Sequence, residues 1–380
     1  MDTNKKAAAA PVAAIVLAAG SSRRMGQPKQ LLMLNGKTLL EHTLGNVREA
    51  GIGEIVLVLG ANAEEIGSRI LTDGLKVVVN AGHEAGMGTS LRTGLAAVSP
   101  EMEAALIVLA DQPFVRPRTL RAIVESRRRT GAQITIPLYN GFRGNPVLLG
   151  RSVFPEVMGL SGDVGCRAIF GTHVEGIHKL PVNDIGVLID IDAPDDVRHL
   201  RLLAPEDDAD AAAVQLPELE IEPREPGENA ESHRELVIIG NDEVAVALAE
   251  LARVLGMQVT VVDPLLGLED FYYADAVLHK LNFSLLGSKE KCVLVASRGR
   301  CDEEALAEAL RTDARYIGLL ANKKRSAEVL TALKYQGFSE GQLKQIHAPA
   351  GIEIGAKSPE EIALSIAAEM VKVTSSRTDG

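Results

Sequence analysis

The amino-acid sequence predicts an α/β protein with two domains, each built on a Rossmann-like sheet covered by helices. Short apolar runs alternate with amphipathic stretches of helical length, which is typical of parallel sheets buried on both faces. A length of 380 residues also exceeds that of one typical domain. An acidic segment without apolar periodicity interrupts the pattern once, so we expect one domain on each side of it.

The first half of the sequence predicts five strands with helices between them. The runs "AIVLAA", "EIVLVLG", "LKVVVN", "ALIVLAD" and "QITIPL" are expected to be the strands. They occupy residues 14–19, 54–60, 75–80, 105–111 and 133–138. The helices are expected at residues 39–50, 64–71, 89–98 and 117–129. The same alternation restarts after the acidic segment with "ELVIIG" (235–240), a helix over 243–255, "QVTVVD" (258–263) and "CVLVAS" (292–297).

The acidic segment sets the domain boundaries. Between Pro205 and Glu235 there are eleven acidic residues and two arginines, a charge of −9 out of −11 for the whole chain. Such a composition favours an extended linker. We therefore expect a first domain over residues 13–203, a linker over 204–234 and a smaller second domain over 235–374. Disordered tails are expected at residues 1–12 and 375–380.

The composition excludes several function classes. An acidic chain without a basic stripe and with 3% aromatic residues is a poor partner for nucleic acid. The three cysteines (Cys166, Cys292 and Cys301) are odd in number and widely spaced, so they form neither a zinc motif nor a disulfide framework. No apolar run is long enough to cross a membrane. We expect a cytoplasmic protein without a membrane partner.

The loop after the first strand predicts a phosphate-binding site. Gly20 allows the backbone to turn, Ser21 and Ser22 offer N–H and hydroxyl groups, and Arg24 and Lys29 bring positive charge. Ligands of such sheets sit beyond the carboxyl ends of the strands, which is where this loop lies. The alternative is an ordinary strand-to-helix turn with solvated arginines.

The motif "LAAGSSRRMGQPK" (residues 17–29) resembles the signature of the MobA-like nucleotidyltransferases that activate molybdopterin, among them the molybdenum cofactor cytidylyltransferases. The resemblance continues in order through "NAGHEAGMGTSLRTGL", "VLADQPF", "RGNPVLL", "SGDVGCR" and "DIDAPDD", up to about residue 200. Guanylyl-transferring relatives usually have glycine where Ala19 stands, so the resemblance implies CTP as the nucleotide. It also implies Mg²⁺, a molybdopterin-type acceptor and release of pyrophosphate.

The resemblance assigns roles to individual residues. Arg24, Lys29 and Asp111 are expected in catalysis, and Asp111 and Asp192 as metal ligands, with Asp190 as a competitor for the second position. The expected nucleotide-binding residues are Ala18, Ala19, Gly20, Ser21, Ser22, Arg24, Lys29 and Ser90. Arg143, Asn145 and Asp163 are expected on the acceptor side. The alternatives are an Asx turn for Asp111 and helix caps for Ser90, Asp163 and Asp192. His83 is left without a role.

The second half begins like a dinucleotide-binding unit. Asp263 follows Gly240 by 23 residues, close to the spacing of a ribose-binding carboxylate. However, Asn241, Asp242 and Glu243 stand where further glycines are expected, and carboxylates there repel a pyrophosphate. The sequence therefore argues against NAD(P) as a cofactor.

The rest of this half resembles the XdhC/CoxI-like proteins that handle molybdenum cofactor for xanthine dehydrogenase and carbon monoxide dehydrogenase. The matching segments are "RGRCDEEAL", "YIGLLANKKRSAEVL" and "HAPAGIEIGAKSPEEIALSIAAEM". In the last of these, Ser358, Pro359 and Glu361 have the spacing of a capping box. Lys323, Lys324 and Arg325 are candidates to receive a phosphate at a helix start, or form a solvated basic turn. Cys301 is expected to be a passive thiol.

Together the two resemblances imply CMP transfer from Mg-CTP to molybdopterin cofactor by the first domain. The second domain would bind, mature or deliver the product to an apo-molybdenum hydroxylase. The alternatives are another nucleotide or acceptor (GTP or a sugar phosphate), a non-catalytic cofactor-binding chaperone, and a more distant NAD-dependent oxidoreductase.

Overall fold

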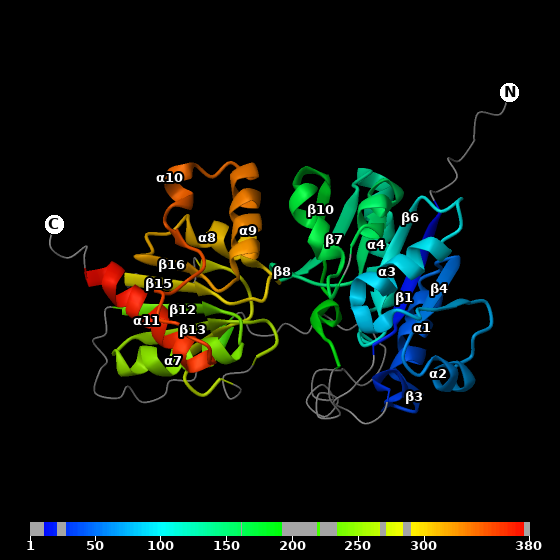
Figure 1. The fold of residues 1–380 in the computed structure, drawn as a ribbon, viewed down its shortest axis with the longest axis horizontal. Helices are drawn as coiled ribbons and strands as arrows, with labels where there is room; N and C mark the ends of the chain where they lie inside the picture. Colours follow the sequence, from blue (N-terminus) through cyan, green and yellow to red (C-terminus); the bar gives the residue numbers. More distant parts are fainter. Residues whose placement is uncertain are drawn as a thin grey trace. The chain divides into compact units, whose positions relative to one another are not determined.

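The computed structural model describes residues 11–20, 28–160, 162–191, 219–220, 234–266, 271–283 and 290–375. The chain divides into two compact units, one of residues 1–139 and 143–211 and the other of residues 140–142 and 212–380. Each unit contains one large sheet packed with helices (Figure 1). The predicted α/β fold class with two Rossmann-like domains is confirmed.

The first sheet has the strand order β10-β7-β9-β6-β1-β4-β5, and β8 pairs with β7. Its strands are β1 (Val12–Ala18), β4 (Glu54–Leu59), β5 (Lys76–Val79), β6 (Ala104–Leu109), β7 (Ile134–Tyr139), β8 (Phe142–Arg143), β9 (Val147–Gly150) and β10 (Ile177–Pro181). A small hairpin of β2 (Met33–Leu34) and β3 (Lys37–Thr38) lies outside the sheet. The predicted strands 14–19, 54–60, 75–80, 105–111 and 133–138 correspond to β1, β4, β5, β6 and β7.

The helices of the first unit alternate with these strands. They are α1 (Leu39–Glu49), α2 (Ala63–Arg69), α3 (Met87–Ala97), α4 (Pro117–Thr130) and α5 (Phe154–Met158), with short 3₁₀ turns η1 (Lys29–Leu31), η2 (His83–Ala85), η3 (Arg151–Val153), η4 (Cys166–Thr172), η5 (Val174–Gly176) and η6 (Ile185–Leu188). Helix α1 begins with a capping box, because Thr38 Oγ1 accepts from Glu41 N and the Glu41 carboxylate accepts from Thr38 N.

Strand β9 departs from the parallel sheet that the sequence predicts. It runs antiparallel to both of its neighbours, β6 and β7. The connection from β7 through β8 to β9 is too short to hold a crossover helix, and only antiparallel strands can be joined that way. As a consequence the start of β9, and not its end, lies at the same edge of the sheet as the end of β6.

The centre of the first sheet is buried on both faces. All seven residues of β1 are buried, and on one face Ile15, Val58 and Ile107 join Leu91 and Leu95 of α3 in one apolar cluster. Full burial of one such aliphatic side chain contributes about 1.5–3 kcal/mol. This core fixes where the ends of β1 and β6 lie.

The second sheet has the order β11-β14-β13-β12-β15-β16-β17, which from β14 to β17 is the 3-2-1-4-5-6 order of a Rossmann fold. Its strands are β11 (Leu219–Glu220), β12 (Arg234–Ile239), β13 (Gln258–Val262), β14 (Ala276–Leu278), β15 (Glu290–Val295), β16 (Tyr316–Leu319) and β17 (Ile346–His347). All of these pairs are parallel except β11 with β14.

Helices cover this second sheet on two sides. They are α7 (Glu243–Val254), α8 (Asp302–Ala309), α9 (Lys323–Tyr335), α10 (Glu340–Leu343) and α11 (Pro359–Ser375). Helices α7 and α11 pack on one face, and α8 and α9 lie on the other (Figure 1). The predicted cap of α11 is confirmed, since Glu361 N donates to Ser358 Oγ at 3.2 Å and Ser358 N donates to the Glu361 carboxylate at 3.1 Å.

Candidate nucleotide-binding site

The candidate site of the first domain lies beyond the carboxyl ends of β1 and β6. These strands are parallel neighbours with Leu17 opposite Leu109, and Ala110 N donates to Leu17 O. The residues that continue them, Ala18–Gly20 and Asp111, therefore reach the same edge of the sheet. This is where ligands of open α/β sheets bind.

A cavity of about 540 Å³ opens at this edge. Its lining includes Ala19, Gly20, Lys29, Ser90, Asp111 and Asp163. The fold thus gathers six of the residues singled out from the sequence, although they span more than 140 positions of the chain. A volume of several hundred Å³ is typical of sites for small molecules and cofactors.

Two of the lining residues form an ion pair. Lys29 Nζ lies 2.5 Å from Asp111 Oδ2, and the two side chains are 20% and 19% exposed. Lys29 comes from η1 after the loop, and Asp111 from the end of β6. A partly exposed ammonium and carboxylate that face a cavity are positioned to receive a phosphate and a cation, respectively.

Gln30 braces the loop and was missed by the sequence analysis. Its buried side chain donates from Nε2 to Ala18 O at 2.9 Å and to Gly20 O at 3.1 Å. With these carbonyl oxygens engaged, the acceptor groups on both sides of Ala19 are turned into the protein. A glutamine within a polar turn carries no sequence signal for this role.

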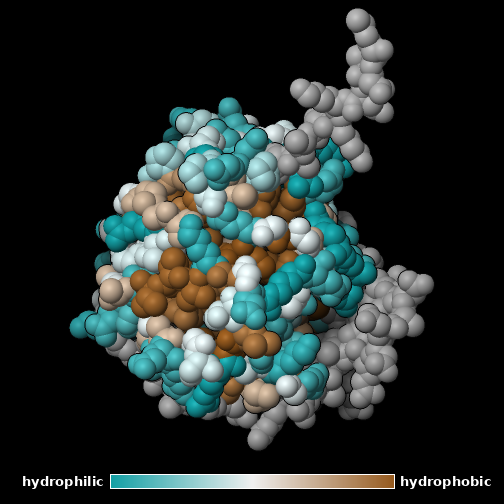
Figure 2. Space-filling view, turned by 90° about the vertical axis from the view of Figure 1, so that its right-hand side faces the viewer, coloured by the Kyte–Doolittle hydropathy of each residue, from teal (hydrophilic) through white to brown (hydrophobic). Residues whose placement is uncertain are grey.

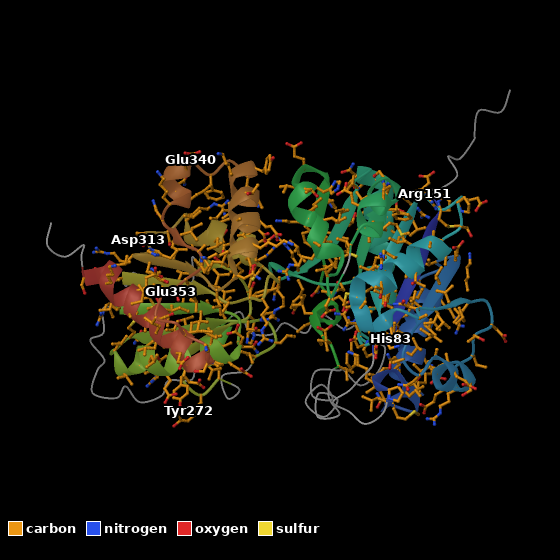
Figure 3. All side chains as sticks on the ribbon, in the orientation of Figure 1. His83, Arg151, Tyr272, Asp313, Glu340 and Glu353 are labelled. Atoms are coloured by element: carbon orange, nitrogen blue, oxygen red, sulfur yellow. The ribbon has the colours of Figure 1, made fainter. Side chains whose placement is uncertain are left out.

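The start of α3 is held by a second amide. Asn80 Nδ2 donates to Thr89 Oγ1 at 2.8 Å and to Ser90 Oγ at 3.0 Å, while its Oδ1 accepts from Gly82 N. Ser90 is buried, and the Asn80 bond leaves its hydroxyl hydrogen free to donate. His83, in the 3₁₀ turn η2 before α3 (Figure 3), also lines the cavity. The bracing fixes one wall of the site against the edge of the sheet.

Gly60 sets the distance between this wall and the loop. A Cβ at position 60 would lie 2.7 Å from Ala19 O and 2.8 Å from His83 Cβ. Real Cβ atoms do not approach other atoms that closely, so only glycine fits without moving one of the two segments.

In the second domain, the strand-end carboxylate is already occupied. Asp263, at the end of β13, is fully buried and accepts from Arg300 Nη2 at 2.6 Å. Asp242 caps α7 by accepting from Ala245 N at 2.9 Å. Gly240 has a positive φ of 109° and approaches Ala296 O so closely that a side chain would collide. The groups that would bind a dinucleotide's ribose and pyrophosphate are thus engaged within the protein.

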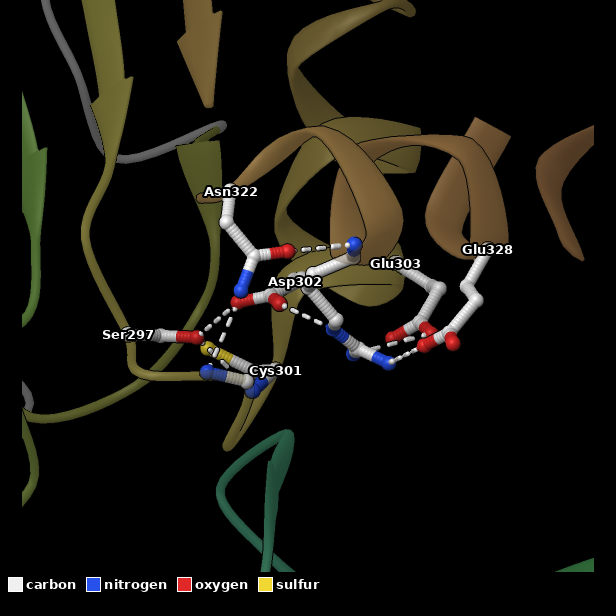
Figure 4. Close-up of polar contacts among 8 residues, drawn as sticks. Ser297, Cys301, Asp302, Glu303, Asn322 and Glu328 are labelled. Carbon is white, nitrogen blue, oxygen red and sulfur yellow. Dashed lines mark hydrogen bonds and ion pairs between the residues drawn. The ribbon is translucent and has the colours of Figure 1, made fainter. Parts of the chain in front are cut away.

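One member of the basic cluster at the start of α9, Arg325, is likewise paired with carboxylates. Arg325 bonds Asp302 at 3.1 Å and Glu303 at 3.2 Å and lies 3.7 Å from Glu328 (Figure 4). Asn322 caps the helix by accepting from Arg325 N. Lys323 and Lys324 are exposed at the first turn. Arg325 is therefore a structural residue in this arrangement: its guanidinium faces carboxylates, and both a bound phosphate and a solvated turn had been open alternatives.

Cys301 belongs to the same region as the Arg325 cluster. It is fully buried, and burial raises the pKa of its thiol well above the ordinary value. The protonated thiol is a poor nucleophile. Its environment agrees with the passive thiol expected from the sequence.

Comparison with known proteins identifies both domains. Residues 14–177 match the MobA-like NTP transferase domain, and residues 236–370 match the XdhC Rossmann domain. Nicotine blue oxidoreductase of Paenarthrobacter nicotinovorans is 33% identical over 165 residues, which are 41% of this chain and 79% of that protein. The chain belongs to the MobA-like NTP transferase family. It is a nucleotidyltransferase that also carries an XdhC Rossmann domain, so both resemblances are confirmed.

Two further proteins are similar to this nucleotidyltransferase over most of their own length. The molybdenum cofactor cytidylyltransferase of Escherichia coli (strain K12) is 28% identical over 185 residues, which are 48% of this chain and 91% of that protein. The crystal structure of Rv0371c from Mycobacterium tuberculosis H37Rv is 36% identical and covers 52% of this chain and 99% of that chain, with a TM-score of 0.46.

Of the three residues expected on the acceptor side of the nucleotidyltransferase domain, one lines the cavity and two do not. Asp163 lines the cavity, and its Oδ1 accepts from the N–H of Met87, the first residue of α3, at 3.3 Å. Arg143 lies on β8, and Asn145 N donates to Val187 O between β8 and β9. Neither of these two residues lines the cavity. Ser21, Ser22, Arg24 and Asp192 lie outside the described residues.

A divalent cation fits the described part of the site. Asp111 faces the cavity, and Asp190 is held near it because Gln112 Nε2 donates to Asp190 Oδ1 at 2.6 Å and Ile191 N donates to Asp111 O at 2.9 Å. Among the described residues no three His, Cys, Asp or Glu side chains form a metal cluster. Mg²⁺ commonly takes one or two carboxylates and completes its shell with phosphate oxygens and water, so it does not need three.

Within the described ranges, the helices are all too short or too polar to span a bilayer.

Proposed function

We propose that this nucleotidyltransferase transfers CMP from CTP to the terminal phosphate of a molybdopterin-type cofactor and releases pyrophosphate. The observation that carries the proposal is the Lys29–Asp111 pair, which faces a cavity at the ends of β1 and β6. The similarity to the E. coli cytidylyltransferase over nearly that protein's whole length supports the choice of nucleotide and acceptor.

The residues of the cavity suit this chemistry. An oxygen of the acceptor's phosphate forms the new bond to the α-phosphorus of CTP, and the bond from that phosphorus to the pyrophosphate oxygen breaks. The acceptor phosphate is already a competent nucleophile, so the site needs charge neutralisation and alignment more than a general base. Lys29 would bind phosphate oxygens, Ser90 would donate to the nucleoside, and Asp111 would hold Mg²⁺, which supplies positive charge to the phosphates when bound.

The test is a reconstituted reaction with the full-length chain. Purified protein is mixed with Mg²⁺, molybdopterin cofactor and either CTP, GTP or ATP, and pyrophosphate and nucleotidylated pterin are both measured. We expect product with CTP and a loss of at least about 10²-fold in rate for Asp111→Asn, because one catalytic charge interaction is removed. Asp73→Asn, at an exposed aspartate outside the cavity, is the matched control.

Each outcome of this reaction is informative. Product with GTP but not CTP would refute the choice of nucleotide. Nucleotide binding without product from any nucleotide would favour a different acceptor, such as a sugar phosphate, or a cofactor-binding chaperone. Full activity in Asp111→Asn would refute the role given to the ion pair.

For the XdhC Rossmann domain we propose binding, maturation or delivery of the product to a molybdenum hydroxylase. Joining two domains in one chain raises the local concentration of a labile intermediate. Transfer of cofactor to an apo-hydroxylase should therefore be faster for the full chain than for an equimolar mixture of a chain with Asp111→Asn and a chain with a disabled second domain. Equal rates would refute delivery within one chain.

An oxidoreductase is the second candidate, and one observation favours it. The relative from P. nicotinovorans is named an oxidoreductase. Oxidation of NADPH or NADH by the purified protein, followed at 340 nm with and without an electron acceptor, tests this reading directly. Turnover would require a dinucleotide site elsewhere than at Asp263 and Asp242 of the XdhC Rossmann domain, which are engaged within the protein, and the absence of turnover would refute this candidate.

A further inference from the structure

Strand β5 is the outermost strand of the nucleotidyltransferase sheet, and among the described residues it pairs with β4 alone. Its exposed side chains are apolar: Val77 and Val79 are 39% and 58% exposed, and Leu71, five residues before the strand, is 75% exposed. Figure 2 views the molecule from the right-hand side of Figure 1, towards which β4 lies, and apolar residues gather on that face. We propose that two copies of this chain join their sheets here as a two-fold dimer, with β5 pairing antiparallel to β5 about Val78.

The backbone of β5 has the right groups free for this pairing. Asn80 N donates to Leu59 O at 2.7 Å, so the even-numbered residues of this stretch direct their N–H and C=O groups at β4. By the alternation of a strand, the N–H and C=O groups of Val77 and Val79 then point outward. Within the described part of the chain no strand occupies that side.

These outward groups are self-complementary. When two copies of β5 run antiparallel about Val78, Val77 of one copy lies opposite Val79 of the other, and each such pair exchanges two hydrogen bonds. Val78 then faces its own equivalent across the axis as a pair without hydrogen bonds. The four valines at positions 77 and 79 lie on one face of the joined sheet and cover one another.

Charge does not oppose the pairing. The last three of the strand's four residues are valines, and in this register Lys76 lies opposite Asn80, so like charges do not meet. Lys76 is also turned from the edge, because its Nζ donates to Ala97 O at the end of α3. Lysine is one of the residues with which proteins guard an exposed edge, and here it does not serve that purpose.

The opposite edge of the same sheet shows what a guarded edge looks like. Strand β10 has the sequence "IHKLP", with His178 and Lys179 at its centre and Pro181 at its end. Proline and charged side chains prevent the addition of another strand. Strand β5 has no such protection, so an apolar partner strand is the chemistry that it fits.

The first experiment measures the mass of the full chain in solution by light scattering over a range of concentrations. We expect the wild type at twice the monomer mass and Val79→Pro at the monomer mass, because proline removes an outward N–H without touching the bonds to β4. Leu364→Lys, at an exposed leucine of α11, is the control and should stay dimeric. A monomeric wild type, or a Val79→Pro protein that remains dimeric, would overturn the proposal.

A second experiment tests the register and does not depend on proline being tolerated. Val78→Cys should form an intermolecular disulfide on mild oxidation, since facing residues of a pair without hydrogen bonds lie about 4.5 Å apart at Cα. Val77→Cys and Val79→Cys should not, because two equivalent residues there are roughly 8–9 Å apart. The native cysteines are buried, which keeps the background low. Cross-linking at 77 or 79 but not at 78 would refute this register.

Discussion

Each domain pairs an aspartate at a strand end with a basic residue, but the aspartate is accessible in one domain and buried in the other. In the nucleotidyltransferase domain, the strand-end carboxylate of Asp111 pairs with Lys29, and both side chains face a cavity. In the XdhC Rossmann domain, the strand-end carboxylate of Asp263 pairs with Arg300 but is fully buried. An acidic residue at the end of a strand therefore marks a ligand site only when the fold leaves it accessible.

The largest effect is expected from Lys29→Met, which removes the positive charge of the accessible ion pair. If Lys29 holds a phosphate in the transition state, the kcat of nucleotidyl transfer should fall about 10²–10³-fold, as it does when one charge-stabilising donor is removed. The free energy of unfolding should change by less than about 1 kcal/mol, because the pair is partly exposed. Pyrophosphate release and urea unfolding measure the two quantities. A stability loss that accounts for the lost activity would contradict the prediction.

The next largest effect is expected from Arg300→Met, which removes the positive charge of the buried ion pair. Loss of Arg300 leaves the buried Asp263 carboxylate without its charged partner, and the free energy of unfolding should fall by about 3 kcal/mol. Nucleotidyl transfer should be unchanged. Four of the five tyrosines lie in the second domain, so tyrosine fluorescence during urea unfolding reports mainly on it. An unaltered midpoint would mean that water replaces the guanidinium.

A smaller effect is expected from Gly60→Ala, which tests how closely the wall of the cavity must approach the loop. The added Cβ would push Ala19 or His83 outward, and kcat/KM for nucleotide should fall by about 10-fold, equivalent to about 1.4 kcal/mol. Gly67→Ala is the matched control, because a Cβ at that position in α2 has open space around it. Equal kinetics for the two variants would show that the wall of the cavity is pliable.

The smallest effect that we expect is a loss of stability of the second domain at acid pH. Burial acts to raise the pKa of Glu369, but hydrogen bonds from Gly351 N, Tyr316 Oη and His347 outweigh it, so the pKa is lowered. A lowered folded pKa gives stability that is present above the unfolded value of about 4.3 and is lost as pH falls through the folded value. Unfolding of wild type and Glu369→Gln followed between pH 7 and pH 3 should converge at the acid end. Parallel curves would argue against this linkage.

Much of the fold was predictable because its signals are local. Apolar runs gave the strands to within a few residues, and the spacing of Ser358 and Glu361 gave a helix cap that the structure contains. Strand β9 was not among the predicted strands, because its apolar run is only four residues long, and its place between β6 and β7 depends on partners far along the chain.

The sequence predicts those residues of the candidate site whose role depends only on their own type and position. The position of Asp111 follows from its place at a strand end. The bracing by Gln30 and the neutralisation of Asp263 and Arg325 do not follow, because each depends on a partner that only folding brings close. Arg300, for example, is 37 positions away from Asp263 in the sequence.

The antiparallel strand β9 has a consequence for the order of events during synthesis. It lies between β6 and β7 although it is made after both, and Ile191, which bonds to Asp111, is made later still. A nascent chain that has emerged only through α4 therefore has β1, β4, β5 and β6, but β6 still lacks its neighbour and the site lacks one wall. Domains fold largely as units, N-terminal first. Nucleotidyl transfer should consequently begin only when the first domain has left the ribosome whole, and until then the bare edge of β6 is the part of the chain that a chaperone would have to cover.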